Sequence, residues 1–263
     1  MSDLSVTAVT PAIGAEVSGV DLSQPLDDAT VSAIHDALMD HQVLFFRDQA
    51  LDVDQLCRFG RCFGEPFIHP IEPCLEGHPG VMAIHTDADS KTIAGNLWHT
   101  DVSFSDAPPM GSILHIHQTP EIGGDTLFAN MYAAYEALSE PLREFLSRCA
   151  TDHESRARFG GYFGIEAETY PQSEHPVART HPVTGRQALF VNQGFTTRII
   201  GLEAAESRVL LDFLFSHINS PRFQCRFTWR PDSLAFWDNR CVQHMALWDY
   251  YPETRSGHRF TIA

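Results

Sequence analysis

Short runs of β-forming residues, separated by turn residues, constrain the fold of this chain more than any other feature. A buried run spans 43–46, and further runs span 112–117, 125–128, 187–191, 223–229, 233–237 and 259 to the end. Strands this short with turns between them are typical of a sandwich or barrel. The pattern alone therefore predicts a mixed α and β chain with a rolled sheet.

Helical periodicity marks four other segments, at 27–41, 52–63, 130–148 and 203–218. In the third we expect a break at Ser139 and Pro141, because proline interrupts a helix interior. The fourth is predicted to turn Val209, Phe213 and Leu214 toward the core. All four segments should pack outside the sheet.

The chain is long enough to bury a large core, with 263 residues, 43% hydrophobic content and 18 phenylalanines. Candidate site residues lie in both halves, and no linker rich in Ser, Gly or Pro separates the halves. We therefore predict a single domain over residues 1–263. The stretch 71–97, rich in Gly, Asp and Pro, is a candidate lid over an active site.

Charge and composition restrict partners and location. A net charge of −16 argues against nucleic acid as a partner, because phosphate binding needs a basic face. No basic and apolar leader pattern opens the chain, and no apolar run is long enough to cross a bilayer, so we expect a cytoplasmic protein without membrane association. Six cysteines without CxxC pairs argue against a zinc knuckle and a disulfide framework and indicate thiols that are mostly buried. The overall charge repels small anions, so a pocket that binds one needs its own arginines.

His99 and Asp101 are the first candidate metal ligands. If the segment around them is extended, their side chains project to the same side and can grip one ion. His244, far downstream, is the candidate third ligand, and Arg255 and Arg259 follow it. Two histidines and one carboxylate leave three positions of an octahedral metal open, as in non-heme Fe(II) enzymes. The arginines suggest that an anionic cosubstrate fills some of those positions.

Most other histidines are expected to be structural. His115 and His117 have the same spacing as a ligand pair, but no carboxylate accompanies them, so cross-strand packing explains them better. We expect His85, His181 and His258 to be structural, with His258 facing away from the site.

An ordered set of motifs gives the chain a family resemblance. The set comprises Gly14-Ala15, Gly19-Val20-Asp21-Leu22, His41-Gln42-Val43, Phe63-Gly64-Glu65, Trp98 to Phe104, Gly123-Gly124-Asp125-Thr126, Thr180-His181-Pro182, Asn192 to Arg198, Trp237-Asp238-Asn239-Arg240 and His258-Arg259. Over nearly its whole length the chain resembles the taurine/α-ketoglutarate dioxygenase family. The resemblance implies an α+β fold with a double-stranded β-helix, or jelly-roll, core and surrounding helices.

The resemblance also implies roles for individual residues. Iron(II) would be bound by His99, Asp101 and His244, with no catalytic side chain beyond the metal centre. Thr126 and Arg255 would hold the distal carboxylate of the cosubstrate 2-oxoglutarate, which suits the bidentate fork of arginine. The anionic head of the substrate would meet Arg259 and His69, inside a pocket walled by Val102, Phe104, Phe159 and Phe195.

The implied reaction uses O₂ and decarboxylates 2-oxoglutarate to succinate and CO₂ while a substrate C–H bond is hydroxylated. The first substrate to consider is taurine or a related sulfonate, which would release sulfite. The same chemistry on an alkyl sulfate, an aryloxyalkanoate or a natural-product intermediate is the alternative. We also expect a homo-oligomer, a dimer or tetramer.

Three positions depart from taurine-specific relatives. These are Glu72, Gly95 and Arg158, where the relatives carry an aromatic residue, an asparagine and a serine. Glu72 and Arg158 either pair with each other or offer a cation site and a second anion clamp to a longer, bipolar substrate. Asn96 compensates for Gly95 if the loop shifts by one residue.

Three other functional classes fit the sequence less well. A jelly-roll binding protein without catalysis is the alternative from a different class, and an intact ligand set argues against it. A zinc hydrolase would have no use for the arginine that follows His244. A halogenase is disfavoured because Asp101 fills the position that a halide would need.

Overall fold

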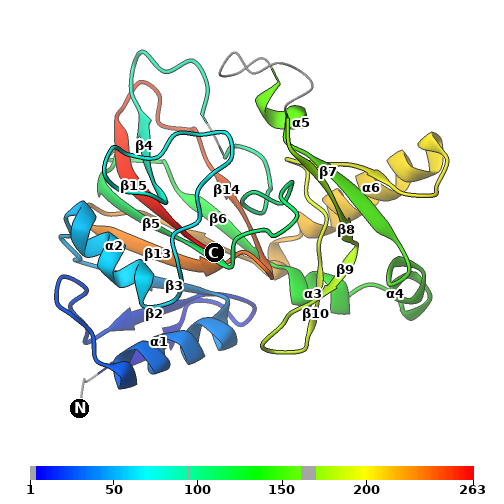
Figure 1. The fold of residues 1–263 in the computed structure, drawn as a ribbon. Coiled ribbons are helices and arrows are strands. Elements are labelled where there is room, and N and C mark those ends of the chain that lie inside the picture. Colours follow the sequence, from blue (N-terminus) through cyan, green and yellow to red (C-terminus); the bar gives the residue numbers. More distant parts are fainter. Residues whose placement is uncertain (1–3, 94, 161–169) are drawn as a thin grey trace.

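The computed structural model describes residues 4–93, 95–160 and 170–263, with residue 158 described by its backbone only. Its centre consists of two sheets that face each other (Figure 1). The larger sheet has seven strands in the order β1 (Ser5–Ala8), β2 (Ala15–Ser18), β3 (Val43–Phe46), β13 (Ser233–Asp238), β5 (Gly111–Gln118), β15 (Arg255–Ile262) and β4 (Val81–Thr86). Neighbouring strands are antiparallel except for β2 and β3, which are parallel. This sheet therefore joins segments from both ends of the chain.

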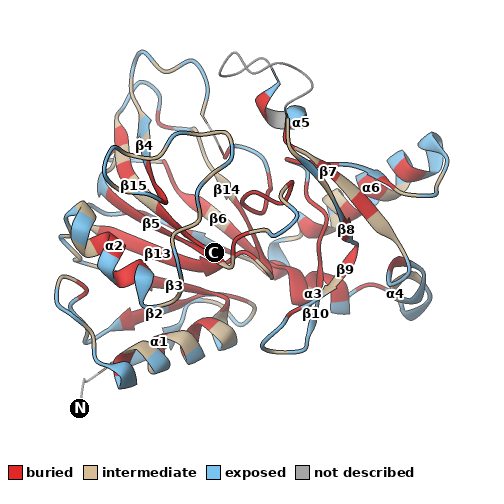
Figure 2. Ribbon diagram, in the orientation of Figure 1, coloured by how far each residue is buried: buried red, intermediate tan, exposed pale blue. Residues whose placement is uncertain are grey.

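The smaller facing sheet has the order β12 (Gln224–Phe227), β6 (Thr126–Asn130) and β14 (Val242–Ala246). Aromatic side chains join it to the larger sheet. The Phe45 ring stacks on Phe227 with centroids 4.0 Å apart, and Phe128 packs against Trp237 at 5.6 Å. In the burial colouring of Figure 2, the central strands β3 and β13 of the larger sheet are buried throughout. The core of the molecule thus lies between the two sheets, close to the candidate ligands.

Helices cover the outer face of the larger sheet, as expected. These are α1 (Asp28–His41) and α2 (Val53–Arg61). Because strand side chains alternate, Phe45 of β3 faces the inner core while Leu44 and Phe46 join the helices in a second buried cluster. Both helices begin at an aspartate whose side chain accepts an N–H of the first turn, from Thr30 in α1 and from Gln55 in α2.

The remaining elements lie beside the smaller sheet. Three strands form a further sheet in the order β11 (Thr196–Ile199), β7 (Ala150–Glu154) and β8 (Gln172–Pro176), and β9 (Ala178–Thr180) pairs with β10 (Gln187–Leu189). The helices here are α3 (Met131–Glu136), α4 (Glu140–Leu146), α5 (Arg156–Phe159), α6 (Ala204–Ile218) and the short 3₁₀ helix η2 (Pro221–Phe223). None of the helices in the described ranges is long and apolar enough to cross a membrane.

The helix predictions are confirmed in position, including the break in the third segment. Asn130 caps α3 by accepting the Ala133 N–H at 3.0 Å, and Pro141 stands in the first turn of α4. The predicted inner face of α6 is wrong in part. Val209 and Phe213 are 70% and 47% exposed, whereas Leu214 is buried as expected. Here Leu211, Leu214 and Ile218 form the buried stripe, at spacings of three and four residues.

Candidate functional site

The structure brings His99, Asp101 and His244 together on the inner side of the two sheets. His244 lies on β14, and His99 forms an isolated antiparallel bridge with it, through two backbone hydrogen bonds of 3.1 and 2.9 Å. Asp101 Oδ1 lies 3.6 Å from His99 Nε2 and 3.8 Å from His244 Nε2. The expected extended segment is wrong, because Asp101 begins a turn. The three side chains meet because the His99 bridge fixes one end of that turn.

The donor set suits a divalent transition metal. All three side chains are buried, and their ligand atoms lie within 4.8 Å of one another. His99 Nδ1 donates to the Leu97 carbonyl at 2.8 Å, so its Nε2 keeps the lone pair that a metal needs. Burial raises the pKa of Asp101, but the positive charge of Arg259 and the neighbouring imidazoles outweigh it and hold this pKa well below its ordinary value. The carboxylate is therefore ready to bind a cation.

Arg259 lies directly beside this group. Its Nη1 donates to Asp101 Oδ1 at 2.9 Å, and its Nη2 lies 3.8 Å from Glu72 Oε2. Glu72 therefore contacts the arginine that was expected to receive the substrate. The side chain of Arg158, its other proposed partner, lies outside the described part of the chain.

His69 is a neutral hydrogen-bond donor at the cavity. Its Nδ1 accepts the backbone N–H groups of Ile71 and Glu72 at 3.1 and 2.8 Å, so the proton sits on Nε2. Burial and the nearby charge of Arg259 lower the pKa of His69 to about 4. The ring therefore stays uncharged at neutral pH.

Arg255 and Thr126 lie together at another part of the cavity. Arg255 is 5% exposed, its Nε donates to the Gly124 carbonyl at 3.1 Å, and its Nη2 has no hydrogen-bond partner among the described residues. Thr126 Oγ1 accepts the indole N–H of Trp229 at 3.0 Å, which leaves the hydroxyl hydrogen to donate. Burial lowers the pKa of Arg255, as expected of a guanidinium held away from water. A carboxylate placed here would satisfy both groups.

One cavity of about 510 Å³ joins these residues. His69, Glu72, Thr126, Arg255, Arg259 and the three candidate ligands all line it. Val102, Phe159 and Phe195 form its apolar wall, but Phe104 is not among the lining residues and packs behind them in the same buried cluster. The expectation that Phe104 walls the pocket is therefore corrected, because its ring is used to support Phe195 at a centroid distance of 4.9 Å.

Some of the remaining positions discussed from the sequence line the cavity and others do not. Gly95 lines the cavity, and its φ of +97° is a backbone conformation that favours glycine. His85, which was expected to be structural, also lines the cavity. His258 does not line it and packs across the strands against His117, with ring centroids 5.4 Å apart. Strand β4 lies within the stretch 71–97, so the proposed lid includes an edge strand of the larger sheet.

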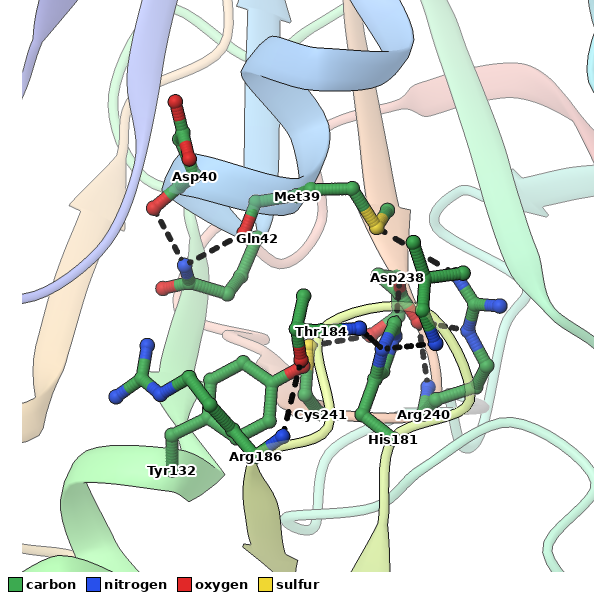
Figure 3. A network of polar contacts seen from close by, with 11 residues as sticks. Met39, Asp40, Gln42, Tyr132, His181, Thr184, Arg186, Asp238, Arg240 and Cys241 are labelled. Carbon is green, nitrogen blue, oxygen red and sulfur yellow. Dashed lines mark hydrogen bonds and ion pairs between the residues drawn. The ribbon is translucent and has the colours of Figure 1, made fainter.

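A second buried group, formed by His181, Asp238 and Cys241, has the composition of a metal site but not its free lone pairs (Figure 3). His181 Nδ1 accepts two backbone N–H groups at 3.2 and 3.1 Å, so its Nε2 is protonated and donates to Asp238 at 3.0 Å. Arg240 donates to both oxygens of the same carboxylate, from Nε to Oδ1 at 2.8 Å and from Nη2 to Oδ2 at 2.6 Å. Burial raises the pKa of the Cys241 thiol well above its ordinary value. This group is therefore a polar cluster that fixes the turn after β13.

Sequence reasoning missed several residues of the site. Ser112 donates to Asp101 Oδ2 at 2.7 Å, and the Trp237 ring packs on His244 with centroids 4.6 Å apart. Trp237 belongs to a motif that contributed to the family resemblance, but no role at the site was predicted for it. For Ser112 the sequence offers no signal, because its role depends on which strand lies beside Asp101.

Comparisons with known proteins agree with this geometry. The family described as "Taurine catabolism dioxygenase TauD, TfdA family" matches residues 5–261. An α-ketoglutarate-dependent sulfate ester dioxygenase of Pseudomonas putida is 37% identical over 274 residues, covering 99% of this chain and 90% of the relative.

Two solved structures extend the comparison. A taurine dioxygenase from Burkholderia xenovorans superposes with a TM-score of 0.86 and 38% identity, covering 98% of this chain and 89% of that one. The structure of AAD-2 in complex with Mn(II) and N-oxalylglycine has a TM-score of 0.84 and 26% identity, covering 99% and 97% of the two chains. The predicted jelly-roll core with surrounding helices is thereby confirmed.

Proposed function

Since this chain belongs to the TauD/TfdA dioxygenase family and is thus a 2-oxoglutarate-dependent dioxygenase, we propose that it uses Fe(II) to hydroxylate a small sulfonate such as taurine. The single observation that carries the substrate class is the position of Arg259. Its guanidinium contacts the carboxylate of Asp101, so an anion bound by Arg259 lies next to the metal position.

His99, Asp101 and His244 would hold the iron, which supplies the oxidising chemistry with O₂ when bound. Arg255 and Thr126 would bind the distal carboxylate of 2-oxoglutarate. The buried guanidinium of Arg255 supports this role, because an anion would satisfy Nη2, which has no partner within 4–93, 95–160 and 170–263.

The substrate head would meet two donors of different kinds. Arg259 offers a charged fork, and His69 offers a neutral Nε2–H that does not titrate near neutral pH. A sulfonate has three oxygens and can accept from both donors. The aromatic wall of Phe159 and Phe195 would exclude water from the carbon next to the sulfur.

The expected products follow from the bond that is hydroxylated. Hydroxylation of the carbon that bears a sulfonate gives an adduct that breaks its C–S bond, releasing an aldehyde and sulfite. In an alkyl sulfate, hydroxylation of the carbon bound to the ester oxygen gives an adduct that breaks its C–O bond, releasing an aldehyde and sulfate. In both cases one O₂ and one 2-oxoglutarate are consumed and one succinate and one CO₂ are formed.

An alkyl sulfate is the second candidate substrate. A cavity of about 510 Å³ is within the range that holds drug-sized ligands, so it has room for an alkyl chain beside the cosubstrate. The relative from Pseudomonas putida, which bears the name of a sulfate ester dioxygenase, supports the same reading. Glu72 favours taurine instead, because its carboxylate lies beside Arg259 and can pair with an ammonium group of the substrate.

The testing experiment measures succinate, sulfite and sulfate from the purified protein supplied with Fe(II), 2-oxoglutarate, O₂ and ascorbate. Taurine, hexanesulfonate and hexyl sulfate are compared. Taurine-dependent succinate with matching sulfite supports the proposal, and hexyl sulfate with matching sulfate supports the second candidate. Succinate formation that none of the anions stimulates would contradict both.

A matched pair of variants tests whether the stimulation by the anion depends on Arg259. Arg259→Gln should abolish stimulation by the anion while 2-oxoglutarate still binds. Arg186→Gln, which changes an exposed arginine paired with Glu136, should behave like the unchanged protein. Loss of activity in both variants would show that the assay reports stability rather than recognition.

We also propose a cytoplasmic homo-oligomer that acts as one domain and does not bind nucleic acid. All six cysteines are free, which supports a reducing compartment, and the net charge of −16 opposes binding to phosphate backbones. Strands from both ends of the chain share the larger sheet, which supports a single domain over residues 1–263. Residues of the stretch 71–97 line the cavity, which supports its role as a lid.

A further inference from the structure

A buried chain of three hydrogen bonds leads from Trp237 to the candidate metal ligand Asp101. The Trp237 indole Nε1 bonds Asn239 Oδ1 at 2.9 Å, Asn239 Nδ2 bonds Ser112 Oγ at 3.0 Å, and Ser112 Oγ bonds Asp101 Oδ2 at 2.7 Å. All four residues are at most 5% exposed. The chain connects β13 and the turn after it, through β5, to Asp101.

The direction of each bond follows from the chemistry of the groups. An indole N–H can only donate, so the Asn239 oxygen accepts and its amide nitrogen donates to Ser112. The Ser112 oxygen is then an acceptor toward Asn239, and its own hydrogen is directed to the Asp101 carboxylate. Asp101 Oδ2 is therefore held as an acceptor of a charge-assisted hydrogen bond.

The two oxygens of Asp101 have different surroundings as a result. Oδ1 is the oxygen that lies 3.6 and 3.8 Å from the two imidazole Nε2 atoms. It also accepts from Arg259 Nη1 at 2.9 Å, and because a carboxylate oxygen has two lone pairs, one remains for a metal. Oδ2 keeps a second lone pair in the same way, but it is directed toward Ser112, and turning it toward the two imidazole nitrogens would strain this buried bond.

We propose that Ser112 and Asn239 are positioning residues that keep Asp101 a ligand through one oxygen only. The inference rests on the proposed metal site. Carboxylates bind metals through one or both oxygens, and a second oxygen would occupy one of the three positions needed by 2-oxoglutarate and O₂. The hydrogen bond to Oδ2 thus keeps those positions open.

Trp237 links this effect to a second ligand. Its ring packs on His244 at a centroid distance of 4.6 Å while its indole N–H starts the chain toward Asp101. The Trp237 and Asn239 positions of one sequence motif therefore act on two of the three ligands. The Asp238 and Arg240 positions between and after them fix the turn itself.

The test counts water molecules on the bound metal, which does not depend on catalysis. Mn(II) is bound to the apoprotein, and the relaxation of water protons gives the number of bound waters. The unchanged protein should carry about three, one for each open position. Ser112→Ala should carry about two, because the freed Oδ2 takes a position, and its affinity for 2-oxoglutarate should fall about tenfold.

Two further variants make the test decisive. Asn239→Asp removes the amide donor and gives the Ser112 hydroxyl a competing acceptor, so it should reproduce the loss of one water with almost no change in volume. Ser207→Ala removes a buried hydroxyl on α6, whose oxygen accepts from Ile199 N at 2.8 Å, and should keep about three waters.

The outcomes separate this inference from the proposed function. If the unchanged protein binds neither Mn(II) nor 2-oxoglutarate, the proposed function fails. If it binds both and Ser112→Ala and Asn239→Asp keep the same water number and affinity, the positioning role is overturned. Should Ser112→Ala not fold at the assay temperature, the comparison of Asn239→Asp with Ser207→Ala decides the question.

Discussion

Replacing Arg255 by glutamine should make the protein without cosubstrate more stable and at the same time destroy its response to 2-oxoglutarate. The glutamine amide nitrogen occupies the position of the arginine Nε, so it can keep the hydrogen bond to the Gly124 carbonyl. What is lost is the charged end of the guanidinium, whose Nη2 has no hydrogen-bond partner among the described residues. The substitution therefore isolates the buried charge.

The magnitude follows from burial. Arg255 is 5% exposed, and an unsatisfied buried donor costs about 1–3 kcal/mol, more when it is charged. Removing it should raise the melting temperature of the apoprotein by roughly 2–10 °C in a chain of this size. Truncating one partner of a buried charge pair costs about 2–5 kcal/mol, so 2-oxoglutarate should bind roughly 30-fold to several thousand-fold more weakly.

Thermal unfolding with and without 2-oxoglutarate measures both effects, with Mn(II) present throughout. Because a ligand stabilises by RT ln(1 + [L]/Kd), a concentration of 100 Kd for the unchanged protein should stabilise that protein by about 2.7 kcal/mol and the variant by about 0.9 kcal/mol or less. The lead of the variant in melting temperature should therefore shrink or reverse when cosubstrate is added. The control is Arg186→Gln, in which an exposed pair with Glu136 is lost.

A contrary result would be an Arg255→Gln apoprotein that melts below the unchanged protein and still gains the full shift from 2-oxoglutarate. That result would make Arg255 a structural residue held by Gly124 and by the Trp229 ring, which lies 5.3 Å from the guanidinium carbon.

Three further predictions concern the substrate end of the cavity, acid stability and the sheet. Glu72→Gln should lower the KM for hexyl sulfate about two- to fivefold, because it removes an anion beside Arg259. It should not lower the KM for taurine, because the ammonium group of taurine loses a partner. Steady-state kinetics with both substrates checks this. His69→Asn, in which the amide oxygen can replace Nδ1 as acceptor, should reduce the loss of stability on acidification. The pKa of His69 is lowered from 6.5 to about 4, so between these pH values the unfolded chain binds the proton and the native state does not. The free energy of unfolding therefore decreases by about 1.4 kcal/mol for each unit by which the pH is lowered in this range. Urea unfolding at pH 7 and pH 5 should show a smaller difference for the variant. Gly257→Ala should destabilise the protein by about 2–3 kcal/mol, because the new Cβ would lie 2.2 Å from the His115 carbonyl oxygen. In Gly77→Ala the new Cβ meets no atom within 4 Å, so this control should cost about 1 kcal/mol through its positive φ alone. Chemical denaturation compares the two variants.

Local sequence was enough to predict most of the helices and the identity of the candidate ligands. Periodicity located α1, α2, α3, α4 and α6, because an amphipathic helix carries its own signal within a dozen residues. Motif resemblance selected His99, Asp101 and His244, and the structure gathers all three in one buried group. Strand β14, which carries His244, was not predicted from its own composition.

How these residues act on one another depends on contacts between remote segments. His99 and His244 are joined backbone to backbone, Ser112 is directed to the far oxygen of Asp101, and Glu72 lies beside Arg259. Each contact joins segments whose pairing depends on strand register, and a shift of one residue would turn each strand side chain to the other face. Val209 and Phe213 are exposed for a related reason, since the face of α6 that is buried depends on what packs against it. Local sequence specifies which groups are available, and the register and packing of remote segments determine which of them meet.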